Sequence, residues 1–289
     1  MSADLSAEGP LEIHRRHGEP VTPSTPIVVF VHGAADRGAA FARVGRELPD
    51  MDVVRFDRRG YGRSLDKGVR RVRSGAEVLA DAVGDLIVVI GSARAAAVVN
   101  GGAPLIVAGH SMGALIALAT AVESPELVSG VVAWEPPMPW ESWWRPSGTT
   151  QRSSSVTPVP DGAPGGDERR RRGAAAMESF LRQRLGDAHW ESLPAGIRRT
   201  REAEGLALVD DMEAARAAEA IEFGAVSVPV VLGVGTATEA RHVRAVTAMT
   251  SLITGASVVS APGADHGAHI THPGVVAAAV RECVGSIRP

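Results

Sequence analysis

The chain carries the sequence Gly-His-Ser-Met-Gly at residues 109–113, directly after an apolar run at residues 105–108 and before an apolar helix predicted for residues 112–123. A serine between a buried strand and a helix occupies a strained turn, and small neighbours are needed because larger side chains would collide with the strand or the helix. The two glycines meet that need. The pattern predicts that Ser111 projects from the carboxyl edge of a parallel sheet, where open α/β folds place their sites.

Apolar runs with the length of buried strands recur on both sides of this turn, separated by helix-like segments. This alternation is typical of a parallel sheet covered by helices, so we predict an α/β fold with a mostly parallel central sheet. Ser74 and Glu77 have the spacing of a capping box, which predicts the start of a long helix. The expected strands are residues 27–31, 52–56, 105–108, 128–134, 228–234 and 257–259, with a weaker candidate at 11–14, and the expected helices are residues 38–48, 74–99, 112–123 and 275–284.

Between residues 137 and 225 the pattern changes from buried strands to helix formers broken by glycine and proline. We interpret this segment as a helical cap, inserted between two strands of a core that is built from residues 1–136 and 226–289. Residues 147–167 are rich in serine, threonine, proline and glycine, which predicts a mobile loop within the cap.

The composition is that of a globular protein, with 45% hydrophobic and 22% charged residues in a chain of 289. Thirty basic and 33 acidic side chains give a formal charge of -3, which argues against binding to nucleic acid. No apolar run is long enough to span a membrane and no signal peptide is visible, so we expect a cytoplasmic protein. The single cysteine, Cys283, supports neither an internal disulfide nor a metal cluster. The oligomeric state stays open.

Three further motifs surround the serine turn. They are Val-His-Gly-Ala at residues 31–34, Asp-Arg-Arg-Gly-Tyr-Gly-Arg-Ser at residues 57–64 and Pro-Gly-Ala-Asp-His at residues 262–266. With these motifs, the chain from residue 26 onward resembles the α/β-hydrolase family. The resemblance implies an α/β-hydrolase fold with a Ser–acid–His triad, in which Ser111 is the nucleophile and the backbone N–H groups of Ala34 and Met112 form the oxyanion hole. It also favours structural roles for His32 and for residues 57–64, which we expect to brace a loop.

The catalytic base is expected to be a histidine on a loop beyond the last strand, because such a loop can reach the serine. His266 follows that strand and matches the family position. His269 and His272 follow it at three-residue intervals, a spacing that could also suggest metal ligands. No cysteine and no second acidic cluster supports a metal there, so we expect neither a metal nor a cofactor.

The triad acid is the point where this chain departs from the common family pattern. The strand after the cap ends in Gly-Thr-Ala-Thr at residues 235–238, without a carboxylate, and the first acid that follows is Glu239. Thr238 and Glu239 also suit the start of a helix. Asp265 is adjacent to His266 and is poorly placed to reach its Nδ1 atom. Glu135 ends the strand before the cap, as the acid does in haloalkane dehalogenases, and we prefer it to Glu239.

The sequence therefore predicts a serine hydrolase that cleaves an ester, thioester or amide of a small, rather apolar substrate, with Trp140, Trp143 and Trp144 lining either the acyl pocket or the core of the cap. Dehalogenation is disfavoured because residue 111 is a serine and not a carboxylate. Two alternatives stay open, namely a binding or sensing protein with negligible turnover and a carbon–carbon hydrolase or perhydrolase that uses the same residues. We expect labelling of Ser111 by a fluorophosphonate to fade below about pH 6.5 as His266 gains a proton.

Overall fold

The computed structural model describes residues 11–19, 22, 24–67, 73–96, 102–144 and 166–287. Most of the segment expected to form a mobile loop, residues 147–167, lies outside these ranges. Its last two residues already belong to a helix, so the loop would end before residue 166.

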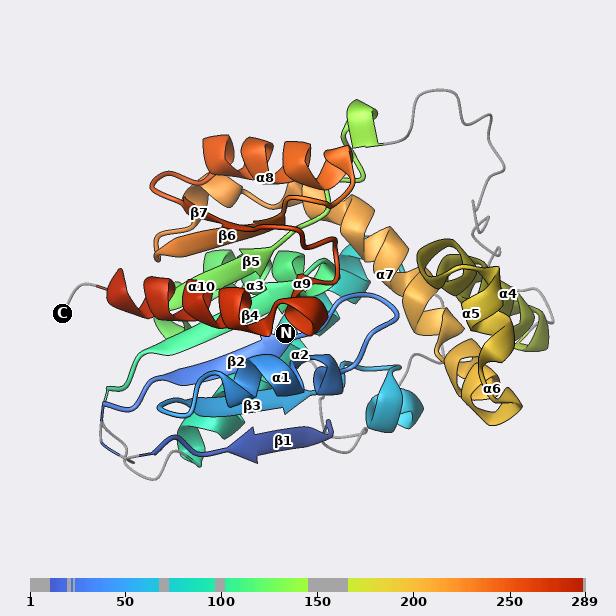
Figure 1. The fold of residues 1–289 in the computed structure, drawn as a ribbon, viewed down its shortest axis with the longest axis horizontal. Coiled ribbons are helices and arrows are strands. Elements are labelled where there is room, and N and C mark those ends of the chain that lie inside the picture. Colours follow the sequence, from blue (N-terminus) through green and yellow to red (C-terminus); the bar gives the residue numbers. More distant parts are fainter. Residues whose placement is uncertain are drawn as a thin grey trace.

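A seven-stranded sheet forms the centre of the molecule (Figure 1). Its strand order is β1-β3-β2-β4-β5-β6-β7, and every neighbouring pair is parallel except β1 and β3. The predicted α/β fold with a mostly parallel sheet is thus confirmed. The strands are β1 (Ile13–Arg16), β2 (Ile27–Val31), β3 (Asp52–Phe56), β4 (Leu105–His110), β5 (Gly130–Trp134), β6 (Val230–Gly235) and β7 (Ser257–Ala261).

Alternation along the strands divides the core between the two faces of the sheet. In β2, Val29 and Val31 face one cluster of buried side chains, and Val28 and Phe30 face the other. The first cluster contains side chains of α2 (Gly75–Ala95), α3 (Met112–Glu123) and α8 (Ala240–Leu252). The second contains side chains of α1 (Ala42–Arg46), α9 (Ala268–Thr271) and α10 (Pro273–Gly285), which Figure 1 shows in front of the sheet.

Helix starts and ends follow the local signals only in part. Ser74 and Glu77 form the predicted capping box at the start of α2. The helix expected at residues 38–48 begins instead as a 3-10 turn, Gly38–Phe41, before α1. Further 3-10 turns are Gly62–Lys67, Pro125–Leu127, Ser142–Trp144, Ala218–Ala220 and Phe223–Ala225. Among the described helices, none combines the length and the apolarity that crossing a membrane requires.

Four helices between β5 and β6 lie beyond the carboxyl end of the sheet (Figure 1). These cap helices are α4 (Gly166–Leu185), α5 (Asp187–Ser192), α6 (Ala195–Ala203) and α7 (Gly205–Ala217). A small apolar cluster joins them to the sheet, because Met177, Trp190 and Leu208 of the cap meet Ala35 and Tyr61 of two sheet-edge loops. The cap therefore rests directly on the loops that follow β2 and β3.

Candidate active site

Ser111 sits on a strained turn between β4 and α3. Its φ of 53° and ψ of -119° lie in a region that non-glycine residues seldom adopt. The N–H of Ser111 donates to the carbonyl oxygen of Trp134 at 2.9 Å, which ties the turn to β5. A side chain at 109 would collide with the carbonyl oxygen of Gly113, and one at 113 with that of Val31. The expected need for small residues around the serine is confirmed.

The two residues expected to form the oxyanion hole flank the serine on separate elements. Met112 begins α3, and Ala34 follows β2 in the loop beside the turn. A Cβ atom on the neighbouring Gly33 would lie 3.2 Å from Cβ of Ser111, so this loop passes close to the serine. Among the described residues, the N–H groups of Ala34 and Met112 have no hydrogen-bond acceptor, which leaves both able to bind an oxygen.

Glu135 and His266 meet at the same edge of the sheet. Glu135 follows β5 with a φ of 47°, and its carboxylate is fully buried. Its Oε2 atom accepts a hydrogen bond from Nδ1 of His266 at 2.6 Å. The same carboxylate accepts hydrogen bonds from the backbone of Gly235 at 2.8 Å and from the hydroxyl of Thr238 at 2.9 Å. Two other donors thus hold the carboxylate against the imidazole.

The other two acids considered from the sequence point elsewhere. Glu239 is the N-cap residue of α8, is half exposed and accepts hydrogen bonds from Arg184 and Arg241. Asp265 is exposed and accepts from the backbone of Gly267. Thr238 and Glu239 do lie at the start of this helix, but Glu239 is its N-cap residue and the Thr238 hydroxyl donates to Glu135.

His266 belongs to a row of four imidazole rings that the sequence does not reveal. Its ring lies 4.2 Å from that of His242 and 4.5 Å from that of His110, which in turn lies 4.1 Å from His269. The Nε2 atom of His110 donates to the carbonyl oxygen of His266 at 2.8 Å, so the residue before the serine is tied to the loop of the histidine. No hydrogen bond joins Ser111 to the ring of His266 within the described residues, and such contacts often tighten only when substrate binds.

Burial disfavours the charged form of three of these rings, His266, His242 and His110. Burial, and after it the nearby positive charge of Arg184, lowers the pKa of His266 from 6.5 to about 3. Burial likewise lowers the pKa of His242 to about 3 and that of His110 well below its ordinary value. For Glu135, burial raises the pKa, and its hydrogen bonds offset part of that rise. At neutral pH His266 is therefore free to accept a proton, beside a carboxylate that would stabilise the resulting charge.

Two groups of histidine and acidic side chains bring possible metal ligands within 4.8 Å of one another, namely Glu135 with His242 and His266, and Asp36 with His110 and His269. In each group, one histidine and the acid are already joined by a hydrogen bond. His266 binds Glu135 at 2.6 Å, and Nε2 of His269 binds Asp36 at 3.0 Å. Among the described residues, the regularly spaced His266, His269 and His272 fall in no common group, and His272 contacts the hydroxyl of Thr271.

The three tryptophans after β5 take different places. Trp140 stacks on Phe223 at 6.2 Å and packs against the main core. Trp144 meets the edge of His242 at 5.1 Å, one ring away from His266, and Trp143 lies beside it at 6.3 Å. Trp144 therefore comes nearest to the histidine row.

The motif at residues 57–64 braces the loop after β2, as expected. Asp57 accepts hydrogen bonds from the backbone of Gly38 at 2.9 Å and of Arg63 at 3.0 Å. His32 has the predicted structural role, because its Nε2 atom accepts from the backbone N–H of Arg58 at 2.9 Å.

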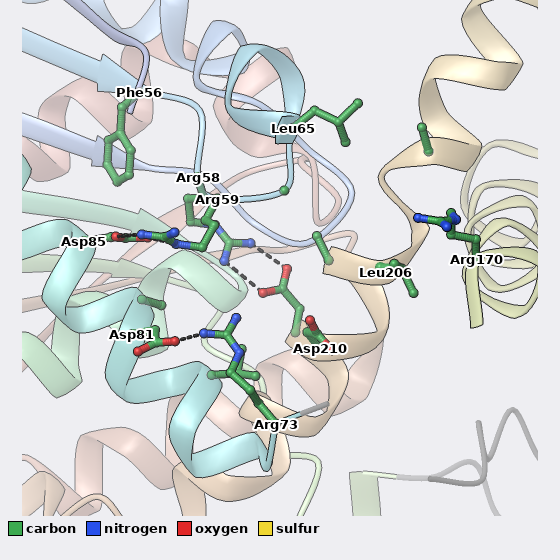
Figure 2. Close-up of a pocket in the computed structure, with 16 residues that line it drawn as sticks. Phe56, Arg58, Arg59, Leu65, Arg73, Asp81, Asp85, Arg170, Leu206 and Asp210 are labelled. Atoms are coloured by element: carbon green, nitrogen blue, oxygen red, sulfur yellow. Dashed lines mark hydrogen bonds and ion pairs between the residues drawn. The ribbon is translucent and has the colours of Figure 1, made fainter. Parts of the chain in front are cut away.

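A cavity of about 340 Å³ lies between α2 and the cap helices (Figure 2). Its walls carry ion pairs, including Arg59 with Asp85 at 2.6 Å and Arg58 with Asp211 at 2.6 Å. None of Ser111, Glu135 and His266 lines it, so it lies beside the serine site and not at it.

Fold and site together define a class of protein. A model of the alpha/beta hydrolase family matches residues 28–279, and the chain belongs to this family.

Individual relatives are more distant. Lipase LipV from Mycobacterium tuberculosis is 26% identical over 128 residues, and this match spans 44% of the present chain and only 42% of the lipase. Among solved structures, a malate-bound thermophilic esterase from Thermogutta terrifontis is 20% identical with a TM-score of 0.60, covering 96% of this chain and 94% of that one. An enol-lactonase from Burkholderia xenovorans is 19% identical with a TM-score of 0.60, covering 96% and 97%. These likenesses show the fold.

Proposed function

We propose that this protein is a serine hydrolase that cleaves an ester, thioester or amide bond through an acyl-enzyme intermediate. Ser111 attacks the carbonyl carbon while His266 takes its proton, and the N–H groups of Ala34 and Met112 bind the oxyanion. His266 then returns the proton to the leaving group, and water repeats the sequence to release the acid. Glu135 orients the imidazole and stabilises its charged form.

The observation that carries this proposal is the 2.6 Å hydrogen bond between His266 and a fully buried Glu135, beside a serine held at a φ of 53°. A buried carboxylate and a strained serine each carry a free-energy cost, and strain of this kind clusters at active sites. Both features have a purpose in nucleophilic catalysis, because the strain exposes the hydroxyl and the carboxylate holds the base.

A small, rather apolar substrate suits the surroundings of the serine. Trp144 contacts His242 at one end of the histidine row, and Trp143 lies beside Trp144. All three tryptophans also pack against the main core, and the stacking of Trp140 on Phe223 favours a packing role for that residue. The names of the relatives, a lipase, an esterase and an enol-lactonase, agree with carboxylic ester chemistry.

The test is turnover of a short p-nitrophenyl ester together with labelling by a fluorophosphonate. We expect wild-type protein to turn over the ester and to be labelled at Ser111, and Ser111→Ala to do neither while keeping its fold. Ser251→Ala, an exposed serine on α8, serves as the control and should behave as wild type. Labelling without steady turnover would favour a binding protein instead. Normal hydrolysis by Ser111→Ala would overturn the nucleophile assignment.

A further inference from the structure

A buried ion pair connects the cap to the loop after β3. The guanidinium of Arg58 binds both carboxylate oxygens of Asp211 on α7, with distances of 2.9 and 2.6 Å. Figure 2 shows Arg58 reaching from the end of β3 toward this helix. Both residues are less than a tenth exposed, and charge-assisted bidentate pairs of this geometry hold their partners in a fixed orientation. The pair is therefore a rigid contact between the cap and the sheet edge.

The same pair extends to the loop beside Ser111. The Arg58 nitrogen that binds Asp211 at 2.6 Å also donates to the carbonyl oxygen of Gly33 at 3.2 Å. His32 adds a second donor to that carbonyl, through Nδ1 at 2.8 Å, because its Nε2 atom accepts from the backbone of Arg58. Two donors thus fix the direction of the Gly33 carbonyl.

The carbonyl of Gly33 and the N–H of Ala34 belong to one peptide unit. In a planar trans peptide the C=O and N–H bonds point in opposite directions, so donors that hold the oxygen on one side aim the N–H to the other. Hydrogen bonds to the carbonyl also polarise the unit and strengthen its N–H as a donor. Tyr61 secures the next residue, since its hydroxyl donates to Asp211 at 2.6 Å and accepts from the N–H of Ala35 at 3.4 Å.

From this geometry we infer that Asp211 and Arg58 are positioning residues for the oxyanion hole, with the cap supplying the carboxylate that orients the Ala34 N–H. The inference rests on the proposed function for the meaning of that N–H, but the orientation of the peptide is a separate structural statement. Asp211 acts through Arg58 and Tyr61 and touches no reacting atom. Through this contact the cap contributes to the chemistry of the serine.

Glu204 provides a matched control. Like Asp211 it is a buried acid at the cap, and it pairs with Arg37 at 2.6 Å and accepts from the backbone of Gly62 at 2.8 Å. It does not contact the peptide between Gly33 and Ala34. Substituting either acid removes an ion pair between the cap and the sheet edge in which the acid is buried. Only the substitution of Asp211 frees the peptide between Gly33 and Ala34.

The first experiment measures the rate of fluorophosphonate labelling of Ser111. Loss of one oxyanion donor lowers rates by about 10²–10³, so a misaligned donor in Asp211→Asn should slow labelling by about 10- to 100-fold. For ester turnover, kcat should fall with KM nearly unchanged, because the oxyanion contact forms only in the transition state. Arg58→Met should show a similar loss. Adding Asp211→Asn to Arg58→Met should slow labelling by less than Asp211→Asn slows the wild type, because only the contact through Tyr61 is then left to lose. Glu204→Gln should label at nearly the wild-type rate.

Equal slowing in Asp211→Asn and Glu204→Gln would assign Asp211 a general structural role and overturn the inference. The second experiment is a crystal structure of Asp211→Asn, in which we expect the peptide between residues 33 and 34 to rotate or to become disordered. An unchanged peptide there would also overturn the inference. If wild-type protein is neither labelled nor active, the proposed function fails, and the crystal structure still decides whether Asp211 orients this peptide.

Discussion

At the scale of single residues, the choice between Glu135 and Glu239 makes a sharp prediction. Glu135→Gln keeps the size of the side chain but offers an amide that can hold the wrong tautomer of His266, so kcat should fall by about 10³–10⁴. Glu239 is half exposed at the start of α8, and Glu239→Gln should cost roughly 0.3–1 kcal/mol of stability with activity retained. Steady-state kinetics of both variants tests this assignment. A larger loss of kcat in Glu239→Gln than in Glu135→Gln would make Glu239 the acid that orients His266.

The ring of His242 stacks on His266 at 4.2 Å with an interplanar angle of 25° and fixes one face of the base. Among the described residues neither of its nitrogens has a hydrogen-bond partner, and Nδ1 stays 3.8 Å from Oε2 of Glu135, so we expect the flat ring to matter more than a proton. We expect His242→Phe to keep most of the labelling rate and His242→Ala to lower it by up to about 10²-fold, as small misplacements of a catalytic group do. Equal losses in both variants would show that the imidazole itself is required.

Because burial lowers the pKa of His266, we expect activity to be lost at a lower pH than that at which an ordinary histidine titrates. The base must be neutral to accept a proton, and its pKa is lowered from 6.5 to about 3, so labelling should stay nearly constant from pH 8 down to pH 5. Below pH 5 we expect the labelling rate to fall as the hydrogen-bonded pair of His266 and Glu135 takes up protons. Because burial raises the pKa of Glu135, the midpoint of that fall describes the pair and not His266 alone. A labelling rate that halves near pH 6.5 would restore the expectation drawn from the sequence and show that His266 is better solvated.

At the scale of elements, the contact between β2 and α3 depends on a residue without a side chain. The Cβ atom of an alanine at 113 would collide with the carbonyl oxygen of Val31, whereas one at Gly84 on α2 would meet open space. Gly113→Ala should therefore destabilise the protein by at least about 1–3 kcal/mol, the usual cost of overpacking. Gly84→Ala should stabilise it by about 0.4–1 kcal/mol. Urea unfolding of the two variants tests the pair, and a stable Gly113→Ala would mean that the helix can shift away from β2.

The strands show which signals the sequence carries. The run at residues 52–56 has the bounds of β3, and the polar residues from Asp57 onward mark its end. β4 continues two residues beyond the predicted end, since Gly109 still pairs with β2 and β5 and His110 with β5, although neither belongs to an apolar run. The apolar pattern therefore locates the buried strands but not the residues outside the apolar run with which a strand ends.

At the scale of the whole molecule, topology explains why Ser111, Glu135 and His266 could be anticipated as neighbours. All three follow strands of a parallel sheet whose carboxyl ends meet at one edge. The position of His242 could not be foreseen, because its burial depends on which face of α8 packs. The pairing of Arg58 with Asp211 joins residues 153 positions apart through the placement of the cap, and no local pattern encodes that distance.

The connection between cap and core also makes a prediction about stability. Glu204 is buried and holds Arg37, Arg201 and the backbone of Gly62, whereas Asp50 pairs with Arg281 on an exposed surface. Hydrogen bonds to charged groups contribute about 1.5–3 kcal/mol when buried, so Glu204→Gln should lower the free energy of unfolding by about that amount. Asp50→Asn removes a solvent-exposed pair and should cost less than about 1 kcal/mol. Urea unfolding at neutral pH compares the two variants, and equal losses would show that the contacts of Glu204 add little to the attachment of the cap.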